Sequence, residues 1–151
     1  MAGVMKVLLD TSVLVAAMVE AHPMHREALP WLQRVKAGVN AGVVTAHVLA
    51  ELYAVLTTLP VQPPISSIVA YYLISHNIVD SCEVVSLTAQ DYMDILSHLS
   101  KRGIVGGATY DALIMHAALK TNVDHIVTFN ERDFRRIYPE LADKVISPSS
   151  E

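Results

Sequence analysis

Short apolar runs alternate with longer segments of helical periodicity along almost the whole chain, and this alternation constrains the fold most. A strand that is buried on both faces reads as a continuous apolar run, and residues 4–9 form such a run that stops at Asp10. Helices between such strands return the chain over the sheet by right-handed crossovers, so the strands lie parallel. We therefore expect an α/β protein, a three-layer sandwich around a mainly parallel sheet of roughly four to five strands.

The same pattern gives approximate boundaries for each element. Strands are predicted at residues 4–9, 42–45, 82–87, 124–128 and 144–147. Helices are predicted at 12–19, 25–37, 46–58, 65–76, 88–101 and 109–121, with Thr88 as an N-cap and Asn77 as a cap after the fourth helix. A turn is predicted at 130–133, and it leads into residues 134–138. The length of 151 residues fits one domain, which we expect over residues 1–147, followed by a frayed tail over 148–151.

Composition excludes some classes of protein. Apolar residues make up 52% of the chain and charged residues 17%, which favours a well-buried core and excludes intrinsic disorder. The chain has 15 Asp plus Glu against 11 Lys plus Arg, a formal net charge of −4. The basic stripe typical of nucleic-acid binders is missing from this balance, so charge counts against such a function unless metal ions offset an acidic site.

Cysteine usage and hydropathy bear on the cellular compartment. The single cysteine, Cys82, lies in an apolar run and is interpreted as a small core residue of a cytosolic protein. The N-terminus lacks a signal peptide, and no apolar run approaches the roughly 20 residues of a membrane span. We expect a cytoplasmic protein that does not contact a membrane.

Three acidic residues stand in apolar surroundings. In open α/β sheets the functional crevice lies outside the carboxyl ends of the strands, where Asp10 follows the first apolar run. A helix cap is an equally good explanation for Asp10. Glu51 lies in the middle of an apolar helical segment, where a buried acid needs a partner unless it faces a solvated edge. Asp111 lies in the first turn of an apolar helix, where the helix dipole alone also favours an acid.

Taken together, the three acids predict a metal site at the strand-exit edge of the sheet. Clustered carboxylates raise one another's pKa unless a cation neutralises them, and oxygen-only ligand sets suit Mg²⁺ or Mn²⁺. Such an ion lowers the pKa of a bound water, so the predicted activity is hydrolysis of a phosphate ester. Thr128, Asn130 and Asp133 follow the fourth predicted strand at the same edge, although turn chemistry also selects Asn and Asp there.

The seven histidines are poor candidates for metal ligands, because they show neither H-x-x-x-H nor H-E-x-x-H spacing. His22 and His25 lie at a loop-to-helix junction, where we expect capping or surface roles. His47 and His116 lie near the second and third acids in the sequence. Contact with the site and ordinary packing are both open for these two residues.

Four segments, taken in order, resemble the PIN-domain ribonucleases, especially the VapC-type toxins of toxin–antitoxin modules. They are LLDTSVL at 8–14, AEL at 50–52, YDALI at 110–114 and VTFNERDF at 127–134. Their order and spacing agree with the family over essentially the whole chain. The resemblance implies a compact α/β domain and cleavage of RNA that depends on Mg²⁺ or Mn²⁺.

The resemblance also implies roles for individual residues. Asp10 and Asp111 correspond to direct metal ligands, and Glu51 corresponds to a ligand that acts directly or through water. The hydroxyl of Ser12 or Thr11 corresponds to the group that helps to order the site.

One departure from the family pattern concerns the fourth acidic position. Many members have an acid where this chain has Asn130, and Asp133 is the alternative candidate for that role. One ion is therefore expected rather than two. The resemblance further implies a homodimer and a cognate antitoxin whose tail blocks the cleft, with residues 48–59 and 65–76 as candidate contact surfaces. The RNA is expected to reach the site as an unpaired stretch or loop.

Other α/β families fit less well. A haloacid-dehalogenase-like phosphatase needs a second Asp where Ser12 stands, and a receiver domain needs an early acid pair and a late Lys, neither of which is evident. A dinucleotide site needs G-x-G-x-x-G directly after the first strand, where the chain has Asp10-Thr11-Ser12. The main non-enzymatic alternative is a catalytically weak PIN-like binding or assembly module.

Overall fold

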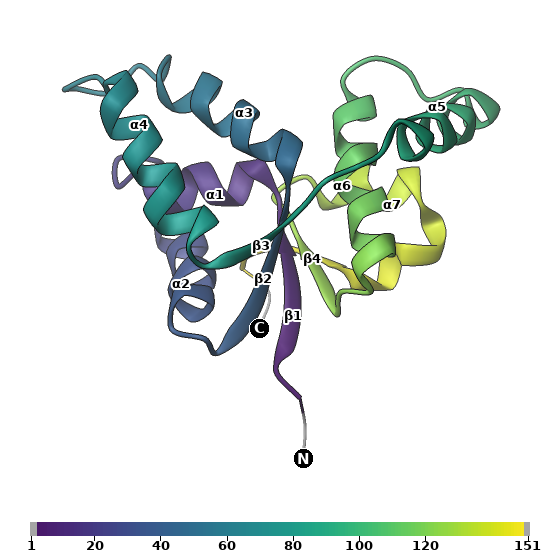
Figure 1. The fold of residues 1–151 in the computed structure, drawn as a ribbon, viewed down its shortest axis with the longest axis horizontal. Helices are drawn as coiled ribbons and strands as arrows, with labels where there is room; N and C mark the ends of the chain where they lie inside the picture. The colour runs from purple at the N-terminus through teal and green to yellow at the C-terminus, as the bar shows by residue number, and fades with distance from the viewer. Residues whose placement is uncertain (1–2, 150–151) are drawn as a thin grey trace.

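Five strands form the centre of the molecule, and within residues 3–149, which the computed structural model describes, all of them run parallel (Figure 1). The sheet order is β3-β2-β1-β4-β5. The strands are β1 (Met5–Leu9), β2 (Asn40–Thr45), β3 (Cys82–Val85), β4 (His125–Val127) and β5 (Val145–Ile146). Each one overlaps a predicted apolar run, so the predicted α/β class with a mainly parallel sheet is confirmed.

Helices cover the strands from two sides, which makes the molecule three-layered (Figure 1). On one side lie α1 (Thr11–Met18), α2 (His25–Lys36), α3 (Ala46–Leu56) and α4 (Ser67–Ile74). On the other side lie α5 (Ala89–Arg102), α6 (Ala108–Thr121) and α7 (Glu131–Ile137). No helix within the described part of the chain is both long and apolar enough to span a membrane.

The order of the strands creates a switch point between β1 and β4. The chain leaves β1 towards β2 through α1 and α2, and leaves β4 towards β5 through α7 on the other side of the sheet. Connections that depart in opposite directions open a crevice at the carboxyl ends of the two strands. Asp10 follows β1 and Thr128 follows β4, so both residues lie at this crevice.

Close packing joins α2 to β2. A Cβ atom on Gly42 would lie 2.6 Å from Val35 Cγ1 and 2.9 Å from Cys82 Sγ, so only glycine fits at this crossing. Burial raises the pKa of the Cys82 thiol to about 11, which keeps the thiol protonated at neutral pH. Both observations agree with the interpretation of Cys82 as a small packing residue.

Several element ends differ from the prediction for local reasons. Helix α3 ends at Leu56, before Pro60, where the hydroxyls of Thr57 and Thr58 donate to the carbonyls of Tyr53 and Ala54. The prediction that Asn77 caps α4 is wrong, because a π-helical turn, Ser75–Val79, extends the helix past it. Thr88 is an N-cap as predicted, and it forms a capping box with Asp91.

Pro148, near the end of the described part of the chain, packs against the fold more closely than the sequence suggests. The prediction of a frayed tail over residues 148–151 does not hold for Pro148, which is buried. The Pro148 carbonyl accepts a hydrogen bond of 2.8 Å from Trp31 Nε1 on α2. Residues 150–151 lie outside the described part of the chain.

Candidate functional site

Asp10 lies at the end of β1 and is almost completely buried, with 4% of its surface exposed. Its Oδ1 accepts a hydrogen bond of 2.7 Å from the backbone N–H of Thr11, which caps α1. Its Oδ2 accepts hydrogen bonds of 2.8 Å from both Ser12 Oγ and Thr128 Oγ1. Burial raises the pKa of Asp10, and these hydrogen bonds oppose the rise. Asp10 is therefore both a helix cap and a buried acid with a fixed orientation.

The hydroxyls that orient Asp10 are themselves held by the chain that follows β4. The backbone N–H of Asn130 donates to Thr128 Oγ1 at 2.9 Å, and that of Phe129 donates to Ser12 Oγ at 3.3 Å. Asp10 and Thr128 are more than a hundred residues apart in the sequence, and the pairing of β1 with β4 brings them together. The sequence alone predicts that both strand ends lie at one edge, but it does not predict these contacts.

A cleft of about 470 Å³ lies at this edge of the sheet. All three predicted acids line it, together with polar groups and an apolar region contributed by α1, α3 and the neighbouring loops. The lining residues are Asp10, Thr11, Ser12, Val15, His22, Met24, Glu51, Val55, Leu59, Asp111, Phe129 and Asn130. The apolar region and His22 are features that the sequence interpretation missed, because single apolar residues on three different elements carry no local signal.

The electrostatics of the cleft are dominated by uncompensated negative charge. Burial, and then the charges of Asp10, Asp133 and Glu51 in that order of importance, together raise the pKa of Asp111 to about 7. Within residues 3–149, neither Lys nor Arg forms an ion pair with the carboxylates of the three cleft acids. The cleft therefore favours a proton or an added cation.

Glu51 differs from its predicted environment. About 33% of its side chain is exposed, whereas the apolar sequence around it predicts a buried helix. Helix α3 buries only one face, formed by Val48, Leu52 and Leu56. Of the two alternatives that the sequence left open for Glu51, the structure shows the solvated edge, because the cleft opens beside it, and this is also why the acid is tolerated there.

The fourth acidic position is divided between two residues. Asn130 lines the cleft but carries no charge. Asp133 is exposed in the first turn of α7, yet its charge contributes to the raised pKa of Asp111. Asn130 therefore supplies polar contact to the cleft, and Asp133 supplies negative potential.

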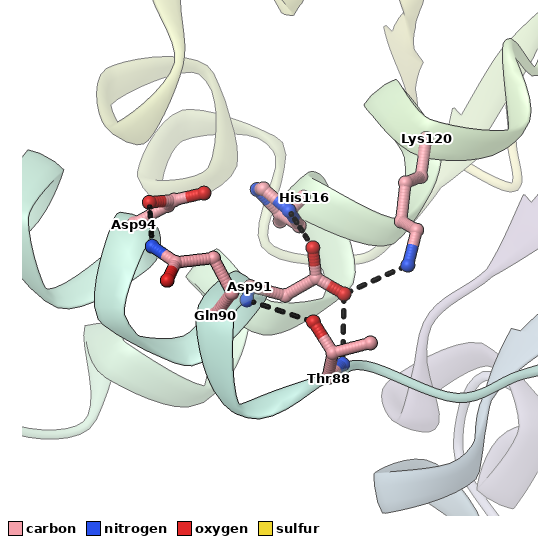
Figure 2. A network of polar contacts seen from close by, with 6 residues as sticks. All are labelled: Thr88, Gln90, Asp91, Asp94, His116 and Lys120. Atoms are coloured by element: carbon pink, nitrogen blue, oxygen red, sulfur yellow. Dashed lines mark hydrogen bonds and ion pairs between the residues drawn. The ribbon is translucent and has the colours of Figure 1, made fainter.

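The two histidines that the sequence left open have different surroundings. His116 Nε2 lies 3.2 Å from Asp91 Oδ1, in a network with Lys120 and the Thr88 cap that joins α5 to α6 (Figure 2). His47 Nε2 lies 3.5 Å from Glu51 Oε2, so His47 does border the site. The sequence distance to an acid, four residues for His47 and five for His116, could not separate these outcomes.

Whether the cleft suits a divalent cation can be tested on its donor atoms. Among residues 3–149, no group of three or more His, Cys, Asp or Glu side chains is already arranged to hold a metal ion. Mg²⁺ needs no such cage, because it keeps several waters and binds through one or two carboxylates. The Thr11 Oγ1 atom in the cleft is buried and has no hydrogen-bond partner in the described residues. An unpaired hydroxyl oxygen beside mutually repelling acids fits a hydrated divalent cation.

Comparisons with known proteins show the family to which the chain is similar. The PIN domain family matches residues 7–139 of the chain. Ribonuclease VapC40 of Mycobacterium tuberculosis is 36% identical over 105 residues, which cover 70% of this chain and 72% of that protein.

Solved structures share the fold at low sequence identity. VapC20 of Mycobacterium tuberculosis, described as a sarcin–ricin loop cleaving toxin, has a TM-score of 0.67 at 16% identity and covers 84% of this chain and 92% of its own. VapBC2 of Rickettsia felis, bound to a DNA fragment from its promoter, has a TM-score of 0.64 at 21% identity and covers 95% and 98%. These similarities support the same fold.

Proposed function

The chain belongs to the PIN-domain family, and on that premise we propose that it is an endoribonuclease that depends on Mg²⁺ or Mn²⁺. It cleaves RNA phosphodiester bonds with a metal-activated water and acts as the toxin of a VapBC-type toxin–antitoxin pair. The observation that carries the proposal is the cleft in which Asp10, Glu51 and Asp111 meet without a compensating Lys or Arg. A protein gains nothing in stability from such a cluster, so a functional role accounts for it best.

The residues of the cleft have distinct roles in this proposal. Asp10 and Asp111 hold the ion directly, and Glu51 holds it directly or through water. When bound, the ion lowers the pKa of a water molecule and stabilises charge on the phosphoryl oxygens. Thr128 and Ser12 keep the Asp10 carboxylate in one orientation through their 2.8 Å hydrogen bonds.

Other groups of the cleft suit the rest of an RNA substrate. The Asn130 amide lines the cleft and is available to orient water or phosphate oxygens. The apolar region formed by Val15, Val55 and Leu59 offers a surface for a base or ribose. Unpaired RNA suits such a cleft, because its bases are free to leave the stack.

Protein partners are a second part of the proposal. Similarity to VapBC2 supports a cognate antitoxin, which we expect to cover the cleft. A homodimer is supported by the exposed apolar face of α4, where Ile68, Tyr71 and Tyr72 are each more than half exposed. Sedimentation of the purified protein measures this directly, and a monomer at micromolar concentration would contradict the dimer. A cytoplasmic location remains a prediction.

The test of the nuclease proposal is cleavage of mixed single-stranded RNAs in Mg²⁺ or Mn²⁺. We expect Asp10→Asn and Asp111→Asn each to lower the cleavage rate on the order of a thousandfold. Asp94→Asn is the matched control, because it removes one exposed carboxylate from α5, outside the cleft, and should retain wild-type cleavage.

Two results would contradict the nuclease proposal. Cleavage that is equal in wild type and both cleft variants would point to a contaminating nuclease. RNA binding without cleavage, in either metal, would favour the alternative of a PIN-like binding module.

A further inference from the structure

We propose that Tyr110, supported by His47, is a stacking platform for an unpaired RNA base beside the bond that is cleaved. The proposal rests on the proposed function and adds a substrate-positioning role for two residues that the carboxylate chemistry does not use. Tyr110 is the third residue of α6, directly before Asp111, and 55% of its surface is exposed. His47 is the second residue of α3.

The two rings form a parallel stack between helices. Their centroids are 5.5 Å apart and their planes differ by 5°. This separation with parallel planes corresponds to an offset stack, the arrangement that aromatic pairs prefer. The contact supports the Tyr110 ring from one side although 55% of the residue's surface is exposed, so less side-chain entropy is lost when a base stacks on its free surface.

The aromatic pair adjoins two of the three cleft acids. Tyr110 precedes Asp111 in the first turn of α6. His47, in the first turn of α3, has its Nε2 atom 3.5 Å from Oε2 of Glu51, one turn further along the same helix. Both helices begin at the carboxyl-end edge of the sheet, where the crevice lies. A nucleotide whose phosphate reaches these acids therefore carries its base close to the exposed ring.

A second histidine–tyrosine stack in the molecule shows what a purely structural pair looks like. The rings of His98 and Tyr138 lie 4.1 Å apart at 8°, Tyr138 is only 5% exposed, and His98 Nε2 lies 2.6 Å from the Ile137 carbonyl oxygen. That pair joins α5 to the end of α7 inside the protein. Packing of this kind does not explain Tyr110, of whose surface 55% is exposed.

The chemistry of a base fits the exposed ring. Proteins that recognise single-stranded RNA commonly stack unpaired bases on aromatic side chains. Such a contact tolerates any base, because every base has a π-face, and it requires no positive charge. This suits a chain whose net charge is −4 and which has few cations with which to hold the phosphate backbone.

The test uses a short single-stranded RNA that the wild-type protein cleaves, and the same RNA made abasic at one nucleotide on either side of the cut. We expect Tyr110→Ala to raise the KM for intact RNA about tenfold, the usual effect of losing one base–aromatic stack, with little change in kcat. Tyr110→Phe and Tyr110→Trp should restore the wild-type KM. On one of the two abasic RNAs, Tyr110→Ala and the wild-type protein should have the same KM.

Control variants separate stacking from other effects. Tyr92→Ala removes another exposed tyrosine, 40% exposed on α5, and should leave the KM unchanged. His47→Ala should raise the KM less than Tyr110→Ala does, and His47→Phe should lower it again, because a phenyl ring can support Tyr110 from the same side. Thermal unfolding of each variant checks that the fold is intact.

The possible outcomes distinguish the platform from the nuclease itself. Wild-type cleavage with an unchanged KM for Tyr110→Ala, or an equal rise in KM on intact and both abasic RNAs, overturns the platform but leaves the nuclease proposal intact. A changed sedimentation coefficient for Tyr110→Ala identifies the pair as a protein interface and also overturns it. If wild type cleaves no RNA, the proposed function fails and the platform fails with it.

Discussion

Two aspartates in the first turns of neighbouring helices have opposite electrostatic surroundings. Asp91 in α5 is surrounded by donors: Lys120 Nζ at 2.7 Å, the Thr88 N–H at 2.8 Å and His116 Nε2 at 3.2 Å (Figure 2). Lys120 first, and then the Thr88 N–H, hold the pKa of Asp91 well below its ordinary value. Burial and the neighbouring acids raise the pKa of Asp111 in α6 to about 7.

The presence or absence of a cationic partner within the protein distinguishes a structural acid from a functional one. Helix α6 supplies both a cation to Asp91, through Lys120, and an acid to the cleft, through Asp111. Asp91 is satisfied by the protein itself and joins α5 to α6. Asp111 has only other acids and partial burial, so its charged form needs a cation from outside the chain.

A cation placed inside the cleft should remove the electrostatic difference between Asp91 and Asp111 most completely. Asn130→Lys introduces an ammonium group at a cleft-lining position, where it can act on Asp111 as Lys120 acts on Asp91. We expect cleavage to fall on the order of a hundredfold, because the ammonium competes with the metal for the carboxylates. Metal-dependent cleavage assays measure this, with Asn130→Gln as a neutral control of comparable length. Full activity of Asn130→Lys would show that the cleft does not need an external cation.

The two aspartates should give the folding stability of the metal-free protein opposite dependences on pH, and Asp111 should also make cleavage depend on pH. Ionised Asp111 is needed to bind metal, so cleavage at limiting metal should fall up to about tenfold for each pH unit below about 7. In the metal-free protein, the raised pKa of Asp111 contributes stability below its ordinary pKa, and this contribution is lost as the pH rises through about 7. The lowered pKa of Asp91 contributes stability at neutral pH, which is lost on acidification.

Thermal unfolding of metal-free wild type, Asp111→Asn and Asp91→Asn across pH 4–8 separates the two contributions. Relative to wild type, Asp111→Asn should become more stable as the pH rises towards 7. Parallel curves for wild type and Asp111→Asn would contradict the raised pKa.

Metal binding should appear as a shift in thermal stability that depends on the cleft alone. Mn²⁺ at about a hundred times its Kd should raise the thermal midpoint of wild type by roughly 5–10 °C. Asp111→Asn should lose most of this shift, whereas Asp91→Asn should keep it. An equal shift in all three proteins would place the ion outside the cleft.

The smallest effect is expected from the structural acid. Asp91→Asn removes the negative charge that faces Lys120 and His116, together with one of the two acceptor oxygens, and should lower the thermal midpoint by a few degrees. Cleavage should remain close to that of wild type, because Asp91 does not line the cleft. A large loss of activity without loss of fold would show that the contact between α5 and α6 positions Asp111.

Secondary structure was the most predictable property of this chain, since buried parallel strands leave continuous apolar runs and helices leave a period of about 3.6 residues. Glu51 shows the limit of such patterns. Its apolar neighbours predict burial, but α3 packs by one face and the cleft exposes the other. The difference between His47 and His116 was equally unpredictable, because it depends on which helix packs against each side chain.

By itself, the sequence determined the α/β class, the strand and helix positions within a few residues, and the identity of the three acids that line the cleft. These follow from local periodicity and from polar residues at the ends of apolar runs. Only the tertiary structure decided the hydrogen bond from Thr128 to Asp10, the 470 Å³ cleft, and the contrast between Asp91 and Asp111. The physical reason is that a pKa, a cavity or an aromatic stack depends on distances between residues far apart in the chain, and such distances leave no periodic signal in a single sequence.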